Sequence, residues 1–274
     1  MSRQLIFILI ALSVAIPLVI KIGLPHEVTS EVMQVYEEID QLDSGSVVLI
    51  SFDHEASSLP EVKPMAQAIL HHCFAKKLKV VGLALLAEGT VIGDQILRQT
   101  ADEYQANYGE GYVFLGFRPQ YQAAILGMGE DIKRVFPQDY NNRPLGQIPM
   151  MKKIKNYEDI SLIISVTDGD MPVWWVDYAV SRYHMKLTVA TTAVMATSFY
   201  PFLSAGQMVG LLGGLKGAAE YEMLIEKPGM GQKGMDAQSV CHLVIILLVI
   251  LGNVSYFLKK SSTVHGRQST AKSF

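Results

Sequence analysis

The sequence reads SVVLISF at residues 46–52, LPEVKPMAQAILHHCFAKK at residues 59–77 and KVVGLALL at residues 79–86. The first and third stretches are short, apolar and contain β-branched residues, which is typical of buried strands. The stretch between them has the length of a helix. This order predicts a β-α-β unit, and because strands joined through a helix run parallel, we expect a sheet that is covered on both faces.

The same alternation continues along the chain. Further strands are predicted in YVFLGF (112–117), ISLIISV (160–166) and MKLTVATTAV (185–194), and further helices within residues 90–108 and 171–184. We therefore predict an α/β fold for residues 45–226, a Rossmann-like or flavodoxin-like sandwich built on a mostly parallel sheet.

Three other segments connect or flank these elements. Residues 24–44 carry apolar side chains at helical spacing and predict an amphipathic connecting helix. Residues 137–159 form a long loop with three prolines, and a loop of this length in a compact domain is often functional or in contact with a partner. Residues 227–239, KPGMGQKGMDAQS, predict a flexible linker.

Charge is distributed unevenly along the 274 residues, although the net charge is only −3. All 26 acidic residues lie between residues 24 and 240, together with 17 of the 23 basic ones. Because binding to phosphate backbones needs a basic face, this acidic middle predicts that nucleic acid is not a partner. The two cysteines, Cys73 and Cys241, are not expected to form a disulfide, since Cys241 lies at the edge of an apolar run.

Both ends of the chain are apolar and flanked by basic residues. Residues 1–23 contain LIFILIALSVAIPLVI and predict a transmembrane anchor, with a cleaved signal peptide as the alternative. Residues 240–258 predict a transmembrane helix, followed by a basic tail at 259–274. Since basic flanks stay in the cytoplasm, we expect a cell-membrane protein with two spans, both termini cytoplasmic and the main domain extracytoplasmic.

A glycine-rich segment, SAGQMVGLLGGLKGAAEYEM (204–223), is predicted to be one helix. Helical spacing places five glycines on or beside one face, where the sheet, a second subunit or a membrane helix would approach closely: Gly206, Gly210, Gly213, Gly214 and Gly217. The segment matches neither a P-loop nor G-x-G-x-x-G, so we expect no nucleotide cofactor. A third membrane segment within residues 187–215, which carry no charge, stays open as an alternative.

Polar residues that follow the predicted strands are the candidate ligand-binding residues. Ligands of open parallel sheets bind beyond the carboxyl ends of the strands, where this sequence places Asp53, His54, Glu55, Glu88, Arg118 and Asp168. Such a set would bind a polar small molecule, or a divalent cation through Asp53 and Asp168. The adjacent His71, His72 and Cys73 point in different directions on a helix and are interpreted as helix surface.

The stretches LGMGEDI (126–132) and GLLGGLKGAAEYE (210–222) resemble an uncharacterised group of microbial membrane-anchored α/β proteins, over most of the chain. The resemblance implies an anchored α/β protein and no particular activity.

No motif of a catalytic nucleophile elbow, a zinc protease or a dithiol pair occurs in the sequence. We therefore expect a membrane-anchored extracytoplasmic domain that acts as a non-enzymatic binding, scaffold or assembly component without a cofactor, with a protein partner or as a homo-oligomer. The first alternative is a module that senses or binds a small molecule or divalent cation. The second is a hydrolase in which Asp53, His54 and Asp168 exchange protons.

Overall fold

The computed structural model describes residues 2–20, 22–24 and 27–270, with side chains described as far as Phe257. The chain divides into two compact units, one of residues 25–232 and one of residues 1–24 with 233–274. The first unit is the α/β domain. Its core is a six-stranded, all-parallel sheet with the order β3-β2-β1-β4-β5-β6. The strands are β1 (Val47–Asp53), β2 (Lys79–Ala84), β3 (Tyr112–Phe117), β4 (Leu162–Thr167), β5 (Leu187–Thr191) and β6 (Gly210–Gly213).

This strand order is the Rossmann-like order, so the predicted α/β class and parallel sheet are confirmed. The predicted strands at 46–52, 79–86, 112–117 and 160–166 correspond to β1 to β4, and residues 185–194 contain β5. The order reverses between β1 and β4. In open α/β sheets the crevice beyond this reversal is where ligands bind.

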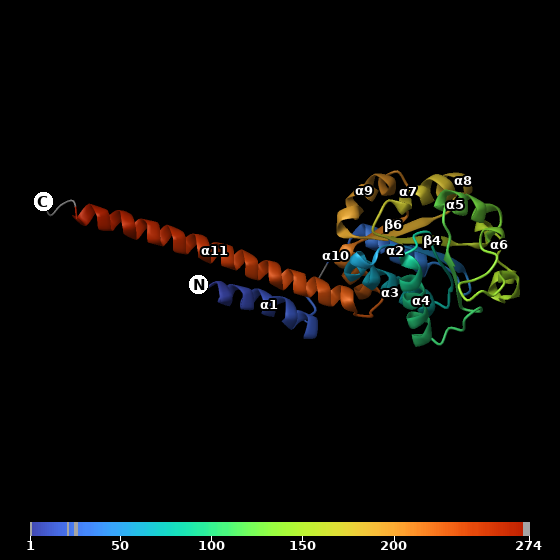
Figure 1. Ribbon diagram of the computed structural model, residues 1–274, viewed down its shortest axis with the longest axis horizontal. Coiled ribbons are helices and arrows are strands. Elements are labelled where there is room, and N and C mark those ends of the chain that lie inside the picture. The colour runs from blue at the N-terminus through green and yellow to red at the C-terminus, as the bar shows by residue number, and fades with distance from the viewer. Residues whose placement is uncertain (1, 21, 25–26, 271–274) are drawn as a thin grey trace. The chain divides into compact units, whose positions relative to one another are not determined.

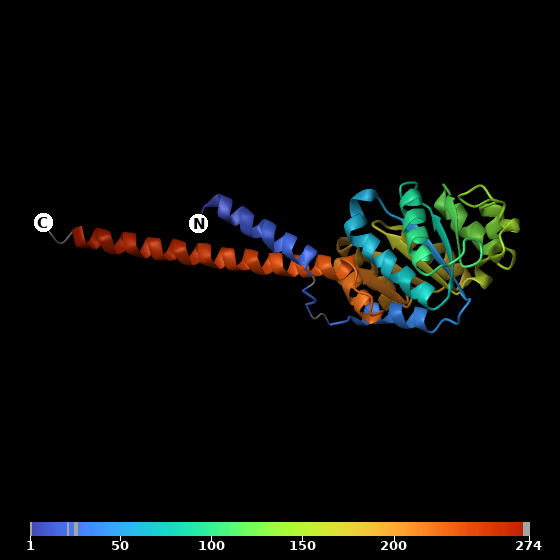
Figure 2. The ribbon, with the colours of Figure 1, turned by 90° about the horizontal axis from the view of Figure 1, so that it is seen from below.

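Helices cover both faces of the sheet (Figure 1 and Figure 2). One face carries α2 (Ser30–Asp40), α3 (Leu59–Ala75), α4 (Gly89–Glu103) and α10 (Gly214–Leu224), and the other carries α5 (Tyr121–Glu130), α6 (Ile132–Val135), α7 (Met171–Trp175), α8 (Ser181–Tyr183) and α9 (Ala193–Ser204). Alternate strand residues therefore enter two cores: Leu49 of β1 packs under α5 to α9, and Ile50 packs under α2 to α4.

The two outer strands pack against other segments. Helix α2 packs on β6 so closely that a Cβ on Gly210 would lie 2.5 Å from Cγ2 and 2.8 Å from the amide nitrogen of Val35. At the edge of β3, the loop at 137–159 folds back, and its Tyr140 amide donates to the carbonyl of Phe114. This loop contains three short 3-10 turns, and its apolar side chains, such as Leu145 and Met151, are buried. A covered edge such as that of β3 hinders pairing with strands of other chains.

The prediction of one glycine-faced helix at 204–223 is wrong. Gly206 lies in a turn with a φ of 70°, Gly210 and Gly213 belong to β6, and α10 begins at Gly214 with a φ of 61°. Each of these positions favours glycine for its own reason. Either the backbone is left-handed, or another segment packs too closely to leave room for a Cβ atom, as Leu212 does at Gly217. Residues 187–215 form β5, α9 and β6, which also excludes a third membrane segment there.

The second unit contains α1 (Arg3–Val19) and most of α11 (Met230–Thr270). Among the residues that the structure describes, one helix is long and apolar enough to cross a membrane: it is the part of α11 at Met230–Phe257, and its most apolar window is unburied. Helix α1 is shorter, with 17 residues.

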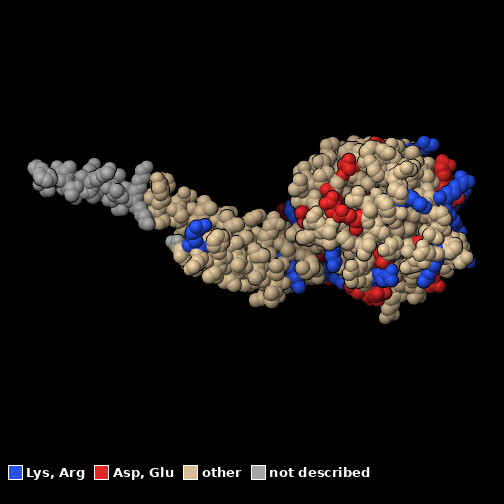
Figure 3. Space-filling model, in the orientation of Figure 1, with Lys and Arg blue, Asp and Glu red and all other residues tan. Residues whose placement is uncertain are grey.

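Figure 3 shows charged side chains of both signs mixed over the α/β domain.

Within this second unit, buried Asp236 of α11 accepts hydrogen bonds from the amides of Gly23 and Leu24, at 2.8 and 3.1 Å. The expected flexible linker at 227–239 is therefore mostly helix, because α11 already begins at Met230. Lys21, the side chains from residue 258 and all of residues 271–274 lie outside the described residues, and with them most of the predicted basic tail.

Substituting alanine for Gly210 tests the close packing of α2 on β6. We expect Gly210→Ala to lower the free energy of unfolding by about 1–3 kcal/mol, because the added methyl group overlaps the backbone of α2. The measurement is chemical denaturation of the full chain. Gly146→Ala is the control, since nothing lies within 4 Å of its Cβ position, and equal effects of the two variants would contradict the close packing.

Candidate functional site

Asp53, at the end of β1, is a buried carboxylate that the fold itself uses. Its side chain is 2% exposed. Oδ1 accepts a 2.6 Å hydrogen bond from the amide of Leu85, and Oδ2 accepts one of 2.5 Å from the hydroxyl of Ser51. Burial raises the pKa of Asp53 to about 6, against the opposing effect of these donors. The hydrogen bond from Leu85 thus connects the end of β1 to the segment that follows β2.

The neighbouring candidates lie together across the reversal between β1 and β4. His54 is fully buried: Nδ1 lies 3.3 Å from the carbonyl of Glu55, Nε2 has no partner among the described residues, and burial lowers the His54 pKa. The amide of Glu55 donates to Oδ2 of Asp168 at 2.8 Å. The hydroxyl of Thr167 donates to the carbonyl of Asp53 at 2.9 Å. Asp53, His54, Glu55 and Asp168 are therefore neighbours, as the topology predicts, but only Glu55 and Asp168 are accessible to solvent.

The other two candidates are placed elsewhere. Glu88 is exposed just before α4 and makes no side-chain cap. Arg118 follows the edge strand β3 and lines a pocket that none of the predicted acidic candidates lines. Within the described residues, no three His, Cys, Asp or Glu side chains gather as metal ligands would, so Asp53 and Asp168 have no third ligand of these types.

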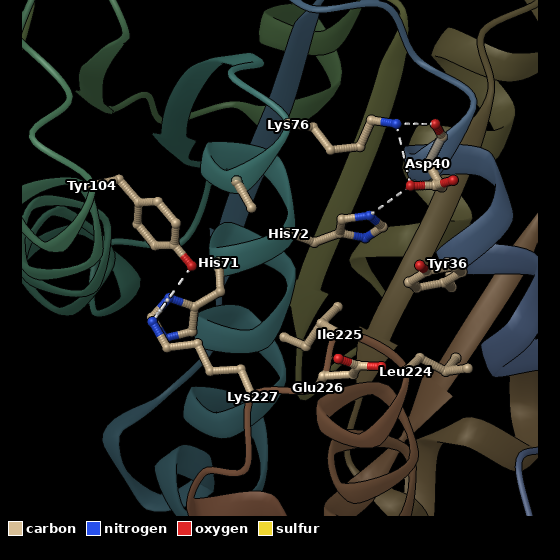
Figure 4. A pocket seen from close by; sticks show the side chains of 11 residues that line it. Tyr36, Asp40, His71, His72, Lys76, Tyr104, Leu224, Ile225, Glu226 and Lys227 are labelled. Carbon is tan, nitrogen blue, oxygen red and sulfur yellow. Dashed lines mark hydrogen bonds and ion pairs between the residues drawn. The ribbon is translucent and has the colours of Figure 1, made fainter.

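A pocket of about 350 Å³ lies where the carboxyl ends of α2, α3, α4 and α10 meet (Figure 4). On one side, Nζ of Lys227 contacts Glu103, Tyr104 and His71, at 2.9, 3.4 and 3.0 Å. The ammonium also lies 4.9 Å from the centre of the Tyr104 ring. Cations are favoured at the carboxyl ends of helices, which explains the basic side chains here.

On the other side of this pocket, His72 links three elements. Its ring stacks on Tyr36 at 4.7 Å, Nδ1 lies 2.8 Å from the hydroxyl of Tyr221, and Nε2 lies 3.5 Å from Asp40. Because an ionised carboxylate only accepts, Nε2 carries the proton and Nδ1 accepts from Tyr221. Burial lowers the pKa of His72, so the ring is neutral at pH 7.

Asp40 also pairs with Lys76, and the ionisable groups of the pocket are thus largely engaged with one another. The interpretation of 71–73 as helix surface needs correction, since His72 and Cys73 are buried. Burial raises the pKa of the Cys73 thiol to about 12, which leaves it unreactive at neutral pH.

Two buried acids of α10 were not singled out by the sequence analysis. Glu220 accepts from the amide and hydroxyl of Thr29, at 2.9 and 2.7 Å, at the start of α2. Glu222 accepts three 2.8 Å hydrogen bonds from backbone amides at the start of α11: those of Gly229, Gly231 and Gln232. Burial raises the pKa of Glu222, against these donors. The signal was present in AAEYE (218–222), where two acids interrupt a segment of small residues.

Comparisons with known proteins add little to this geometry. No family model matches the chain, and no curated protein matches it. Among solved structures, the chain is similar to the C-terminal domain of a group 1 family glycosyl transferase (LpcC) from Francisella tularensis, with 14% sequence identity and a TM-score of 0.35. The match covers 82% of this chain and 95% of that domain. A likeness this weak carries no argument about activity, and the fold assignment rests on the observed strand order.

Replacing Asp53 by asparagine tests its raised pKa. In the unfolded chain the pKa of Asp53 is about 4, whereas in the folded protein burial raises it to about 6. As the pH rises through this interval, ionisation of Asp53 therefore lowers the stability of the folded state. An asparagine at this position stays neutral. We expect Asp53→Asn to be more stable than the natural protein by roughly 1–3 kcal/mol above pH 6. The advantage should shrink toward pH 4, as measured by urea unfolding across this range.

Asp43→Asn, on an exposed turn, is the matched control and should change stability by less than about 0.5 kcal/mol. A difference between Asp53→Asn and the natural protein that does not vary with pH would show that Asp53 is not buried as the structure has it.

Proposed function

We propose that this protein is a membrane-anchored, non-enzymatic α/β module that serves as a binding or scaffold component. The observation that carries the proposal is the uncharged apolar run at 240–258 of α11, which lies in a helix whose most apolar window is unburied. Its 19 residues extend about 28 Å at 1.5 Å per residue, close to the roughly 30 Å of a hydrocarbon core. An apolar surface of this extent needs lipid or protein to cover it.

The short connection between the α/β domain and the uncharged run supports a role at the membrane surface. The uncharged run at 240–258 begins eight residues after Gln232, the last residue of the α/β unit. A connection of this length keeps the domain next to the membrane if the run crosses it, which favours a role in binding or assembly there.

For the orientation we propose two spans with both termini in the cytoplasm and the α/β domain outside. Helix α1 has 17 residues, about 26 Å, so it would cross only with help from its flanking residues. Arg3 at the start of α1 and the basic residues after 258 favour cytoplasmic ends. If the first segment is a cleaved signal peptide, the domain is still placed outside.

A non-enzymatic role is supported by the burial of the residues that a hydrolase would need. Asp53 is 2% exposed and His54 is fully buried, so neither side chain reaches a substrate without a rearrangement.

A partner-binding role is supported by α9, whose exposed face is uncharged and includes Val194 at 80% and Tyr200 at 44% exposure. That face would suit a protein partner or a second copy.

Carbonate extraction of membranes that contain the full chain tests the anchoring. We expect the natural protein to stay in the membrane pellet. A Leu247→Lys, Leu251→Lys double variant should be released more readily, because each charge at a helix centre costs about 2.5–3.5 kcal/mol on insertion scales. The Leu247→Ala, Leu251→Ala variant is the matched control and should stay in the pellet.

Crosslinking in the same membranes before extraction tests the binding role, and a discrete crosslinked species is expected. Release of the natural protein by carbonate would overturn the anchoring, and a chain that crosslinks to neither a partner nor itself would overturn the scaffold role.

A further inference from the structure

A second pocket, of about 630 Å³, lies beside the edge strand β3 and is separate from the pocket of Figure 4. The end of β3 supplies one wall and residues 136–142 supply the other. The residues that matter for its chemistry are Gly116, Phe117, Arg118, Phe136, Asp139 and Tyr140. This volume lies within the range of roughly 300–1,000 Å³ that is usual for small-molecule sites.

A β-bulge shapes the first wall. The pairing of β2 with β3 shifts by one residue, from Gly82 opposite Phe114 to Ala84 opposite Phe117. Gly116 lies inside this irregularity with a φ of 85°, and the ring of Tyr140 would be 3.3 Å from a Cβ at this position. Bulges re-aim the side chains that follow them. Here the ring of Phe117 is 40% exposed at the pocket, and Arg118 comes next.

Internal hydrogen bonds fix the second wall. Oδ1 of buried Asp139 accepts from the amides of Asn141 and Arg143, at 2.9 and 2.7 Å, and Oδ2 accepts from the hydroxyl of Tyr108 at 2.6 Å. Both oxygens of the acid that lines this pocket are therefore already engaged. The amide of Tyr140 is bonded to β3, so this wall is formed before any ligand arrives.

Arg118 is the cation of the pocket, and it has an unsatisfied donor. Its guanidinium lies 5.1 Å from the centre of the Phe136 ring, which holds it in place. Nε is buried and donates to no described acceptor, and no described carboxylate lies within 4.0 Å of the group. Arg118 as a whole is only half-buried, so an anion bound in the pocket would supply the charged partner that the described residues do not.

We propose that this pocket binds a small organic carboxylate with an aromatic body. The planar fork of Arg118 matches a carboxylate, and the exposed rings of Phe117 and Tyr140, at 40% and 39%, would contact the aromatic part. This inference does not depend on whether α11 crosses a membrane.

The test is a ligand-observed NMR titration of the full chain in lipid nanodiscs, with empty nanodiscs as the blank. The probes are benzoate, the uncharged analogue benzamide, and acetate, which lacks the ring. We expect saturable binding of benzoate, and binding of benzamide and of acetate that is weaker by about tenfold or more, because each probe lacks one of the two contacts.

Two matched variants locate the site. Arg118→Gln should weaken benzoate binding by about tenfold or more, the loss expected for a hydrogen bond between charged groups. Arg143→Gln removes an exposed guanidinium that lies over Tyr108 outside the pocket, and should leave the affinity unchanged. The proposal is overturned if benzoate does not bind, if benzamide binds equally well, or if the two variants behave alike with thermal melts that show both are folded.

Discussion

Two buried carboxylates on one helix, α10, bind the starts of two other helices. A helix begins with backbone amides that have no partner in the helix, and a carboxylate placed there satisfies them and matches the helix dipole. Glu220 does this for α2 and Glu222 does it for α11. Burying a charge is costly without such donors, so each acid fixes the first residues of the helix that it binds. Helix α2 in turn packs on β6, so the packing of this strand depends on the same contacts.

At the crevice between β1 and β4, where a Rossmann-like sheet commonly binds ligands, several polar groups are already engaged in hydrogen bonds within the protein. Thr167 donates to the carbonyl of Asp53, and the amide of Glu55 donates to Asp168, so β1 and β4 are joined by hydrogen bonds at this crevice. Of the four candidate residues there, Glu55 and Asp168 are accessible to solvent. Arg118, whose Nε has no described acceptor, lies instead at the edge of the sheet, beside a bulge.

The sequence allowed the strands from β1 to β5 to be predicted because each is a continuous apolar run between helical segments. It did not reveal β6, since GLLG is short and its glycines happen to recur at helical spacing, although they serve a strand and a helix start. Topology correctly predicted that Asp53 and Asp168 would be neighbours. Burial of Asp53 was not predictable, because it depends on tertiary hydrogen bonds. The separation of Arg118 depends on a bulge whose one sign in the sequence is Gly116 within the strand YVFLGF.

Hydrogen exchange at the start of α11 tests the role of Glu222 most directly. In the natural protein the amides of Gly229, Gly231 and Gln232 should be protected, and Glu222→Ala should speed their exchange by about tenfold or more, as expected when a charged acceptor is lost. Glu88→Ala, which removes an exposed acid, should leave them unchanged. If these amides exchange equally fast with and without Glu222, the carboxylate does not hold the start of α11, and the role assigned to the buried acids of α10 is contradicted.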